Sequence, residues 1–406
     1  MVATPAPLRD SRFRPFFFGR LVSMLGDSMG VIALSLAVLG ASGRPSDLGI
    51  VLAAQMLPRL LLLLLGGVVA DRWSRRTLLI WSSLGSAVTQ GVVAGILITG
   101  RYDVTLIAVM ALLNGAIDAF ASPALRGIVP EVIPADQIQQ ANSLLSSSQS
   151  AVRIAGPTLA ALISAKWGGG WAVAVDAASF VAAAAWLARV PLSRSATPAQ
   201  GSLLGDARQG WTILRSLPWA MTMITSFAAL NLVNVGPWNI LGADITSHDH
   251  GQTAWGLTLS VRAIGLLVAG IVMYKLTFRR PLLAGRIAGI VIGLPLICMG
   301  LRAPLFVTLV AVVVAGLGFT CAAITWETTL QTHVPQDSLS RVAAYDDLLS
   351  LAAIPLGQIA VGPLASHFGS HVVALVSGIA LCIAASAPAL SRSVRDLGPE
   401  SPHPSA

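Results

Sequence analysis

Twelve long apolar segments constrain the fold of this chain more than any other feature of its sequence. Each has about 20 or more residues with few charges, the length that a helix needs to cross a bilayer. Only 11% of all residues are charged, so a soluble fold could not bury the apolar surface. The chain is therefore predicted to be an all-α membrane protein with twelve transmembrane helices. The segments are residues 16–41, 46–70, 77–99, 103–126, 138–165, 169–188, 217–241, 254–276, 281–301, 303–326, 338–366 and 370–390.

Lysines and arginines fall mostly on one side of this arrangement. Of the 26 Lys and Arg residues, most lie in segments on the same side as the N-terminus. The positive-inside rule then predicts that both termini are cytoplasmic. This distribution also accounts for the net charge of +8 without nucleic-acid binding. The positively charged residues expected outside are Arg44, Arg101, Lys166 and Arg302.

The two halves of the sequence resemble each other. An offset of 201 residues aligns Pro134 with Pro335 and holds without a gap to Gly168 and Gly369. A period near half the chain predicts two six-helix, pseudo-symmetric bundles. The expected parts are an N-terminal bundle at 1–188, a cytoplasmic linker with a short amphipathic segment at 189–216, a C-terminal bundle at 217–392 and a disordered tail at 393–406.

A short charged hinge, residues 67–76, separates the second and third apolar segments. Its glycine would let two helices pack closely, and its aspartate would be favoured at a helix N-terminus in the opposite half. A plain positively charged loop is the alternative, but it does not explain the glycine and aspartate spacing. A weaker copy at 270–280 has Tyr274 where the first has the aspartate. The hinge residues of interest are Gly67, Asp71, Arg72, Arg75 and Arg76.

The hinge resembles the signature loop between spans 2 and 3 of the major facilitator superfamily, with Ser74 where the family has glycine. Further stretches look like the branch that holds bacterial macrolide and enterobactin exporters. The resemblance implies a drug:proton antiporter in which the hinge latches the two halves in one state. Asp346 and Asp347, near the start of the eleventh segment, are further latch candidates, of which one is expected to face the hinge loop; the alternative is a solvated helix start. The matching stretches are Pro58, Pro123–Ala124, Ile128–Val129–Pro130, Ala141–Asn142–Ser143–Leu144 and, without the flanking glycines, the antiporter-like Gly156–Pro157.

Ionisable residues inside apolar spans are costly, so each is a functional candidate. Asp27 and Asp118 are the candidates for proton coupling. A permanent Asp27–Arg59 ion pair is the structural alternative for Asp27. For Asp118, contact with the hinge is an alternative to proton coupling, and the sequence favours neither. The candidate charge partners within the membrane are Arg59, Arg153 and Arg262.

Polar residues within the spans are candidates for the lining of a substrate cavity. Asn234 and Trp238 are four residues apart and therefore share a helix face. Hydrogen bonding between helices is the alternative interpretation of such residues. The full set is Gln55, Asn114, Gln149, Asn231, Asn234, Trp238 and Gln358.

No catalytic or phosphate-binding motif is evident, so no enzyme activity, cofactor or metal site is expected. The sequence predicts a secondary transporter in a bacterial inner membrane that exports hydrophobic or amphipathic small molecules by proton antiport. Its expected partners are the substrate, protons and lipid, without nucleic acid, and it is expected to be a monomer. The alternatives are proton-independent transport or uptake of a small metabolite, and a membrane sensor or scaffold that does not transport.

Overall fold

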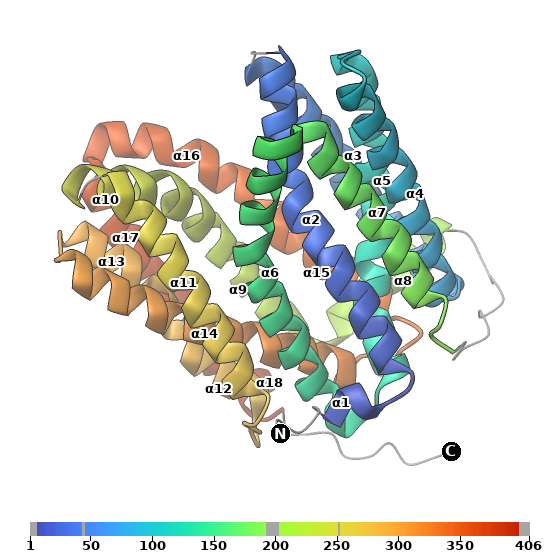
Figure 1. Ribbon diagram of the computed structural model, residues 1–406. Coiled ribbons are helices and arrows are strands. Elements are labelled where there is room, and N and C mark those ends of the chain that lie inside the picture. The colour runs from blue at the N-terminus through green and yellow to red at the C-terminus, as the bar shows by residue number, and fades with distance from the viewer. Residues whose placement is uncertain (1–5, 43–44, 192–202, 251, 398–406) are drawn as a thin grey trace, which may run out of the picture. The chain divides into compact units, whose positions relative to one another are not determined.

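The computed structural model describes residues 6–42, 45–191, 203–250 and 252–397, and these residues are almost entirely helical (Figure 1). The first half contains α1 (Ala6–Arg9), α2 (Phe13–Ser42), α3 (Pro45–Arg72), α4 (Arg75–Ile98), α5 (Val104–Val132), η1 (Ala135–Gln137), α6 (Ile138–Trp167), α7 (Gly169–Leu187) and α8 (Leu203–Ser216). The second half contains α9 (Pro218–Gly236), η2 (Pro237–Leu241), α10 (Gly242–His250), α11 (Gln252–Met273), α12 (Pro281–Gly289), η3 (Ile290–Gly293), α13 (Leu294–Gly300), α14 (Leu305–His333), α15 (Leu339–Leu351), α16 (Ala353–Phe368), α17 (Ser370–Ser386), η4 (Ala387–Leu390) and α18 (Arg392–Arg395).

Among the described residues, 11 helical segments are long and apolar enough to cross a membrane. They account for every expected span except the fifth, at 138–165. That region is α6, a single helix of 30 residues and so about 45 Å long, which suffices to span a bilayer. Gln139, Gln140 and the serines at 146–148 make it more polar than the others. With α6, the helices fit the expected twelve-helix fold of two bundles.

The seventh span departs from a regular α-helix. It runs through α9, η2 and α10 as far as His250, nine residues beyond the expected end at 241. Pro237 begins a π-helical turn, η2. Proline has no N–H to donate and disturbs the regular hydrogen-bond ladder, so a wider turn at this position has a local cause.

The chain forms two compact units. The first consists of Met1–Ala141, Ala151–Trp211 and Val334–Tyr345, and the second of Asn142–Ser150, Thr212–His333 and Asp346–Ala406. Each unit therefore includes a short segment from the opposite half of the sequence. For the first unit this segment holds the start of α15, and for the second it holds part of α6.

In the first unit, α3 packs along α5, while α7 packs against both α2 and α4 (Figure 1). The α3–α5 approach is close because Gly66 lies directly against the backbone of Ala119. Small residues at helix interfaces allow such contact. Val38, Ile107 and Ala172 are fully buried in the apolar core that these helices enclose.

In the second unit, α14 packs against α11 and α12, α9 against α16, and α13 against α17. Its apolar core includes Trp238, Leu296 and Leu381. The core therefore takes side chains from α13, α17 and the irregular turn η2.

The internal repeat has a structural counterpart. Gly168 separates α6 from α7 with φ of 92°, and Gly369 separates α16 from α17 with φ of 87°. Side chains disfavour this backbone region, so glycine is needed at both turns. The next helix begins directly after each glycine, at the positions that the offset of 201 residues aligns.

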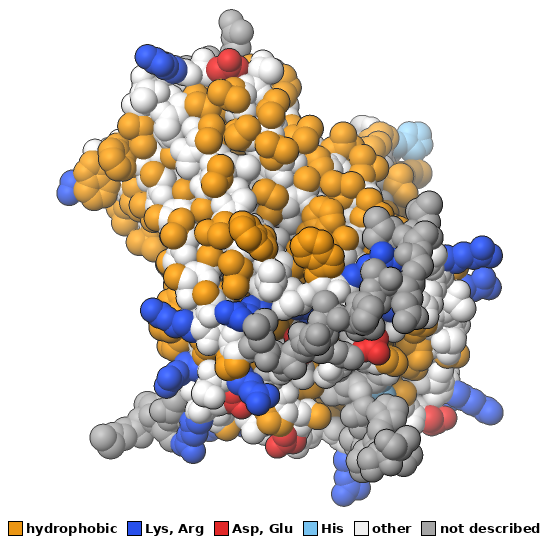
Figure 2. Space-filling view, turned by 90° about the vertical axis from the view of Figure 1, so that its right-hand side faces the viewer, with side chains coloured by type: hydrophobic (Ala, Val, Ile, Leu, Met, Phe, Trp, Pro, Cys, Tyr) orange, Lys and Arg blue, Asp and Glu red, His pale blue; other side chains and the backbone are white. Residues whose placement is uncertain are grey.

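Large apolar side chains remain exposed on many helices, including Ile359 at 73% and Leu61 at 70%. On the face in Figure 2, hydrophobic side chains cover much of the upper region, whereas Lys and Arg lie mainly below it. An extensive exposed apolar surface of this kind is what lipid contact requires.

The ordered chain extends further than expected at its C-terminal end. Val394 is fully buried within α18, so the predicted start of a disordered tail at 393 is wrong. The rest of that tail, 398–406, and linker residues 192–202 lie outside the described residues. The expected amphipathic linker segment is the helix α8.

Candidate functional site

The hinge is a tight connection between two long helices. α3 ends at Arg72, and α4 begins at Arg75 after Ser74, whose hydroxyl caps the helix by accepting a hydrogen bond from the N–H of Thr77. Serine is a favoured N-cap residue. Gly67 lies against the first turns of α15, where an added Cβ would come within 2.7 Å of the Ala344 Cβ.

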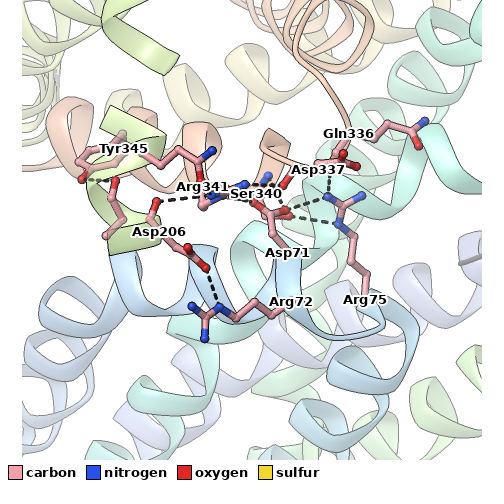
Figure 3. A network of polar contacts seen from close by, with 11 residues as sticks. Asp71, Arg72, Arg75, Asp206, Gln336, Asp337, Ser340, Arg341 and Tyr345 are labelled. Carbon is pink, nitrogen blue, oxygen red and sulfur yellow. Dashed lines mark hydrogen bonds and ion pairs between the residues drawn. The ribbon is translucent and has the colours of Figure 1, made fainter. Parts of the chain in front are cut away.

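Asp71 lies at the N-terminus of α15 (Figure 3). Its carboxylate accepts hydrogen bonds from the backbone N–H of Ser340 at 3.2 Å and of Arg341 at 3.1 Å. It also accepts from the Arg341 Nε at 3.0 Å and pairs with Arg75 at 2.9 Å. The Asp71 side chain is only 4% exposed. A carboxylate is favoured here because the free N–H groups give a helix N-terminus positive character.

Arg75 is the most connected side chain of the hinge and is also only 4% exposed. Besides Asp71, it binds Glu131 at 2.7 Å and donates to the carbonyl of Gly127 at 2.8 Å. It also donates to the Ser340 hydroxyl at 3.1 Å. Buried charges need paired and hydrogen-bonded surroundings, and this arginine has them from α3, α5 and α15.

The helix α8 joins the same network (Figure 3). Arg72 pairs with Asp206 at 2.6 Å, and Arg341 donates to the Gln209 side chain at 2.9 Å. The Tyr345 ring contacts that of Trp211 at a tilt of 48°, with ring centroids 5.4 Å apart. We refer to Asp71, Arg72, Arg75, Glu131, Asp206, Ser340 and Arg341 together as the hinge network.

A second group of charges lies within the helices of the first unit. Asp27, midway along α2, forms an ion pair with Arg20 at 3.8 Å. Arg59 of α3 also acts electrostatically on Asp27, and Asp118 of α5 interacts with all three of these residues. The Asp27 side chain is 49% exposed although it lies in mid-helix.

Asp176 of α7 is the fifth member of this charge cluster and the most buried, at 1% exposed. Its carboxyl group lies against Gly26 and Gly30 of α2. It interacts electrostatically with Asp27 and Asp118. We refer to Arg20, Asp27, Arg59, Asp118 and Asp176 as the charge cluster.

Two of the expected cavity residues lie together in the first unit. Gln55 and Asn114 line a small cavity with Gln90, between α3, α4 and α5. Asn114 is buried and accepts a hydrogen bond from Thr89 at 3.2 Å. This part of the bundle can therefore hold a small polar group or water.

In the second unit, Asn234, Trp238 and Arg262 line another small cavity together with apolar residues of η3, α13 and α14. The Arg262 guanidinium lies 4.7 Å from the Trp238 ring centre, a cation–π geometry. Asn231 donates to the Ser350 carbonyl at 2.9 Å and so links α9 to α15. For Asn231, the interpretation as a hydrogen bond between helices fits this contact.

A buried arginine of the second unit was not expected. Arg286 of α12 is 1% exposed, and its guanidinium lies 4.8 Å from the Phe227 ring centre. The described residues provide no partner for its Nε and Nη1 atoms.

The described residues contain no group of three or more His, Cys, Asp or Glu that could hold a metal ion.

The family model of the Major Facilitator Superfamily matches residues 16–349. The chain belongs to the major facilitator superfamily. This confirms the resemblance drawn from the hinge and places the chain among multi-pass membrane transporters, a family of carriers.

Relatives and solved structures agree with this membership of the superfamily. The multidrug efflux pump Tap of Mycolicibacterium fortuitum is 25% identical over 379 residues, which cover 90% of this chain and 92% of Tap. Macrolide efflux protein A of Streptococcus pyogenes is 22% identical over 207 residues, covering 50% of this chain and 51% of that protein. A bacterial homologue of the iron transporter ferroportin, in an outward-facing state, has a similar fold, with a TM-score of 0.75 at 18% identity, covering 92% of this chain and 97% of that one.

Some expected contacts differ from those of the structure. The ion-pair partner of Asp27 is Arg20, whereas Arg59 or Arg153 was expected. Arg20 lies two turns before Asp27 on α2, and its long side chain reaches along the helix. Arg153 is exposed on α6. For Asp118, contact with the hinge was one of two alternatives. Asp118 belongs to the charge cluster, and Arg75 pairs with Asp71 and Glu131.

Asp346 binds residues of α14 and α15, and the latch role of Asp346 and Asp347 stays a prediction. Asp346 is 3% exposed and accepts hydrogen bonds from the Trp326 Nε1 at 2.9 Å and from Ser350. Asp346 and Asp347 lie in the second turn of α15 and beyond, not at its start. The backbone N–H groups and Arg341, at the real start of the helix, contact the hinge.

Other expected residues are only placed by the structure. Arg76 donates to the carbonyl groups of Leu187 and Ala188 at the end of α7. Gln149 is half-buried on α6, and Gln358 is exposed on α16. Their roles stay predictions.

Sequence reasoning missed several charged residues of both sites. Arg20 and Arg286 were not among the candidate charges within the membrane, although both fall within expected spans. Asp176 was overlooked, although a lone acid in an apolar helix is a signal that could have found it. Arg341, Glu131 and Asp206 carry no distinctive motif, and only the folded chain brings them to the hinge.

Proposed function

We propose that this superfamily member exports hydrophobic or amphipathic small molecules across a bacterial inner membrane in exchange for protons. Its efflux relatives support export. The observation that carries proton coupling is the exposed position of Asp27 within the charge cluster. A carboxylate that protons can reach, next to arginines within an apolar bundle, is suited to cycle between charged and neutral forms.

In this proposal, protonation of Asp27 weakens its attraction to Arg20 and Arg59. The two arginines are then free to interact with other groups, so the protonation state changes the balance of charge within the first unit. The hinge network acts as a conformational latch, closed while Asp71 binds the start of α15. Alternating access follows when substrate and proton favour opposite states of this latch.

The test uses purified protein in proteoliposomes with an imposed pH gradient and a panel of charged and neutral drugs. We expect substrate efflux to dissipate the gradient for wild type, and to do so clearly less for Asp27→Asn. Asp103→Asn is the matched control, because Asp103 is an exposed acid that caps α5 and asparagine also caps helices well. Undiminished coupling in Asp27→Asn would remove Asp27 from the mechanism.

The same assay separates the alternatives. Transport that continues at an equal rate without a proton gradient would replace antiport by proton-independent transport. Accumulation driven inward would indicate uptake of a metabolite. Failure to move any compound, together with stable binding of a protein partner, would favour a sensor or scaffold.

A further inference from the structure

The contact between α2 and α7 is built around a carboxyl group. An added Cβ at Gly26 would come within 2.6 Å of the Asp176 Oδ1, and a Cβ at Gly30 would also collide with the Asp176 carboxylate. The two glycines, one helical turn apart, therefore form a recess that any larger side chain would fill. The recess accepts the carboxyl group of Asp176 and brings the two helices close together.

In the part of the chain that the structure describes, one oxygen of this carboxyl group is buried without the hydrogen-bond partner that an ionised acid requires. Asp176 is 1% exposed, and its Oδ1 has no hydrogen-bond partner among the described residues. The cost of burying an unpaired carboxylate is high, and the usual solution is to neutralise the group. Ser179, on the same helix, donates to the backbone carbonyl of Asp176 and not to its carboxylate.

The charges around Asp176 do not compensate it either. Those that act on it are Asp27 of α2 and Asp118 of α5, both acids. The other charged residues of α2 are Arg14 and Arg20, and α4 carries none between residues 77 and 98. Two like charges nearby favour the neutral form of the third acid.

We propose that Asp176 is a second proton-binding carboxyl group of the transport cycle, neutral while it occupies the recess between Gly26 and Gly30. The proposal rests on the proposed proton antiport. Asp176 and Asp27 interact electrostatically. When one of them loses its proton and becomes negative, loss of the proton from the other becomes less favourable. Asp176 would thus bind a proton in the arrangement in which Asp27 is charged and paired with Arg20.

Infrared difference spectroscopy of the purified protein tests the protonation state without any transport. Protonated carboxyl groups and carboxylates have separate C–O stretching bands. We expect the wild type minus Asp176→Asn spectrum at neutral pH to contain the protonated-carboxyl band. Carboxylate bands in its place would overturn the proposal.

Two further variants keep the test informative if Asp176→Asn does not fold. Gly30→Ala retains the acid but fills its recess, so we expect the protonated-carboxyl band to weaken. Gly91→Ala is the matched control, because nothing lies within 4 Å of a Cβ at that position, and it should retain the band. An unchanged band in Gly30→Ala would contradict the role of the recess.

Proton counting in proteoliposomes then tests the role in transport. We expect Asp176→Asn to move about half as many protons per substrate as wild type, as expected when one of two proton-binding groups is removed. An unchanged proton count would overturn the second-site proposal while leaving antiport intact. If wild type moves no protons with substrate, the proposed antiport is overturned instead. The infrared result on the protonation of Asp176 does not depend on that outcome.

Discussion

The two hinges use similar packing and different chemistry. In the first unit, Gly67 lies against the start of α15, and Asp71 pairs with the buried Arg75 and with Arg341 of that helix. In the second unit, Gly270 lies against Ser147 of α6 in a similar way, but the copy has Tyr274 in place of the acid. The close glycine contact is thus repeated, whereas the buried ion pairs belong to the first hinge.

The helix α6, which meets Gly270 of the second hinge, also makes neutral polar contacts with α14. Asn142 of α6 donates to the Gln331 side chain at 2.8 Å and to the Thr328 hydroxyl at 3.1 Å. Each neutral hydrogen bond contributes about 0.5–1.5 kcal/mol. Removing one partner of a buried ion pair costs about 3–5 kcal/mol, because the other charge stays buried. The comparison therefore predicts unequal effects of equivalent mutations.

The largest effect is expected for Asp71→Asn. The neutral side chain leaves Arg75 and Arg341 without their shared anion, so the contact with α15 should weaken by about 3–5 kcal/mol. This corresponds to a factor of roughly 100 or more in a conformational equilibrium. Transport rates in proteoliposomes should fall strongly at unchanged expression. A rate near that of wild type would reduce the hinge to a positively charged membrane anchor.

A smaller effect is expected for Gly67→Ala, and a still smaller one for Gly270→Ala. The new methyl group at 67 meets the Ala344 Cβ at 2.7 Å and the Ser340 carbonyl at 2.8 Å, which only a helix shift can relieve. At 270, the nearest atom is the Ser147 hydroxyl, which can rotate away. Transport rates and thermal stability of both variants should follow this order, with Gly91→Ala unaffected. Equal losses at both glycines would show that backbone crowding limits both hinges alike.

The smallest effect is expected for Tyr274→Phe. This change removes one hydroxyl and no charge, so it should cost about 1 kcal/mol at most. Transport and proton coupling should stay within about a factor of five of wild type. A loss as large as that of Asp71→Asn would break the proposed asymmetry between the hinges.

Much of the fold follows from sequence because a lipid environment leaves few choices. Each apolar segment must form a helix to satisfy its backbone, so hydropathy places the spans. The fifth span shows the limit, since α6 is polar enough to fall below a hydropathy threshold yet is a 30-residue helix. The offset of 201 residues correctly aligned Gly168 with Gly369, because both turns need the same backbone conformation.

The residues that make up the sites could be predicted from the sequence less completely than the fold. Asp71 and Arg75 were predicted from spacing, because the hinge is a local motif. Their partners Glu131 and Arg341 are 56 and 270 residues away from Arg75 and Asp71, and no local pattern connects them. The hydrogen bond between Asp346 and Trp326 was not foreseen for the same reason, since Trp326 lies on another helix.

The sequence by itself determined the membrane-spanning helices, the doubled architecture and the charged hinge, because hydropathy, repeats and short motifs are read along the chain. Only the tertiary structure decided which charges meet. It paired Asp27 with Arg20, placed Asp71 at the N-terminus of α15 and set Asp176 between two glycines of α2. These outcomes depend on distances of a few ångströms between packed helices, and packing is settled by the side chains of all the neighbouring segments together.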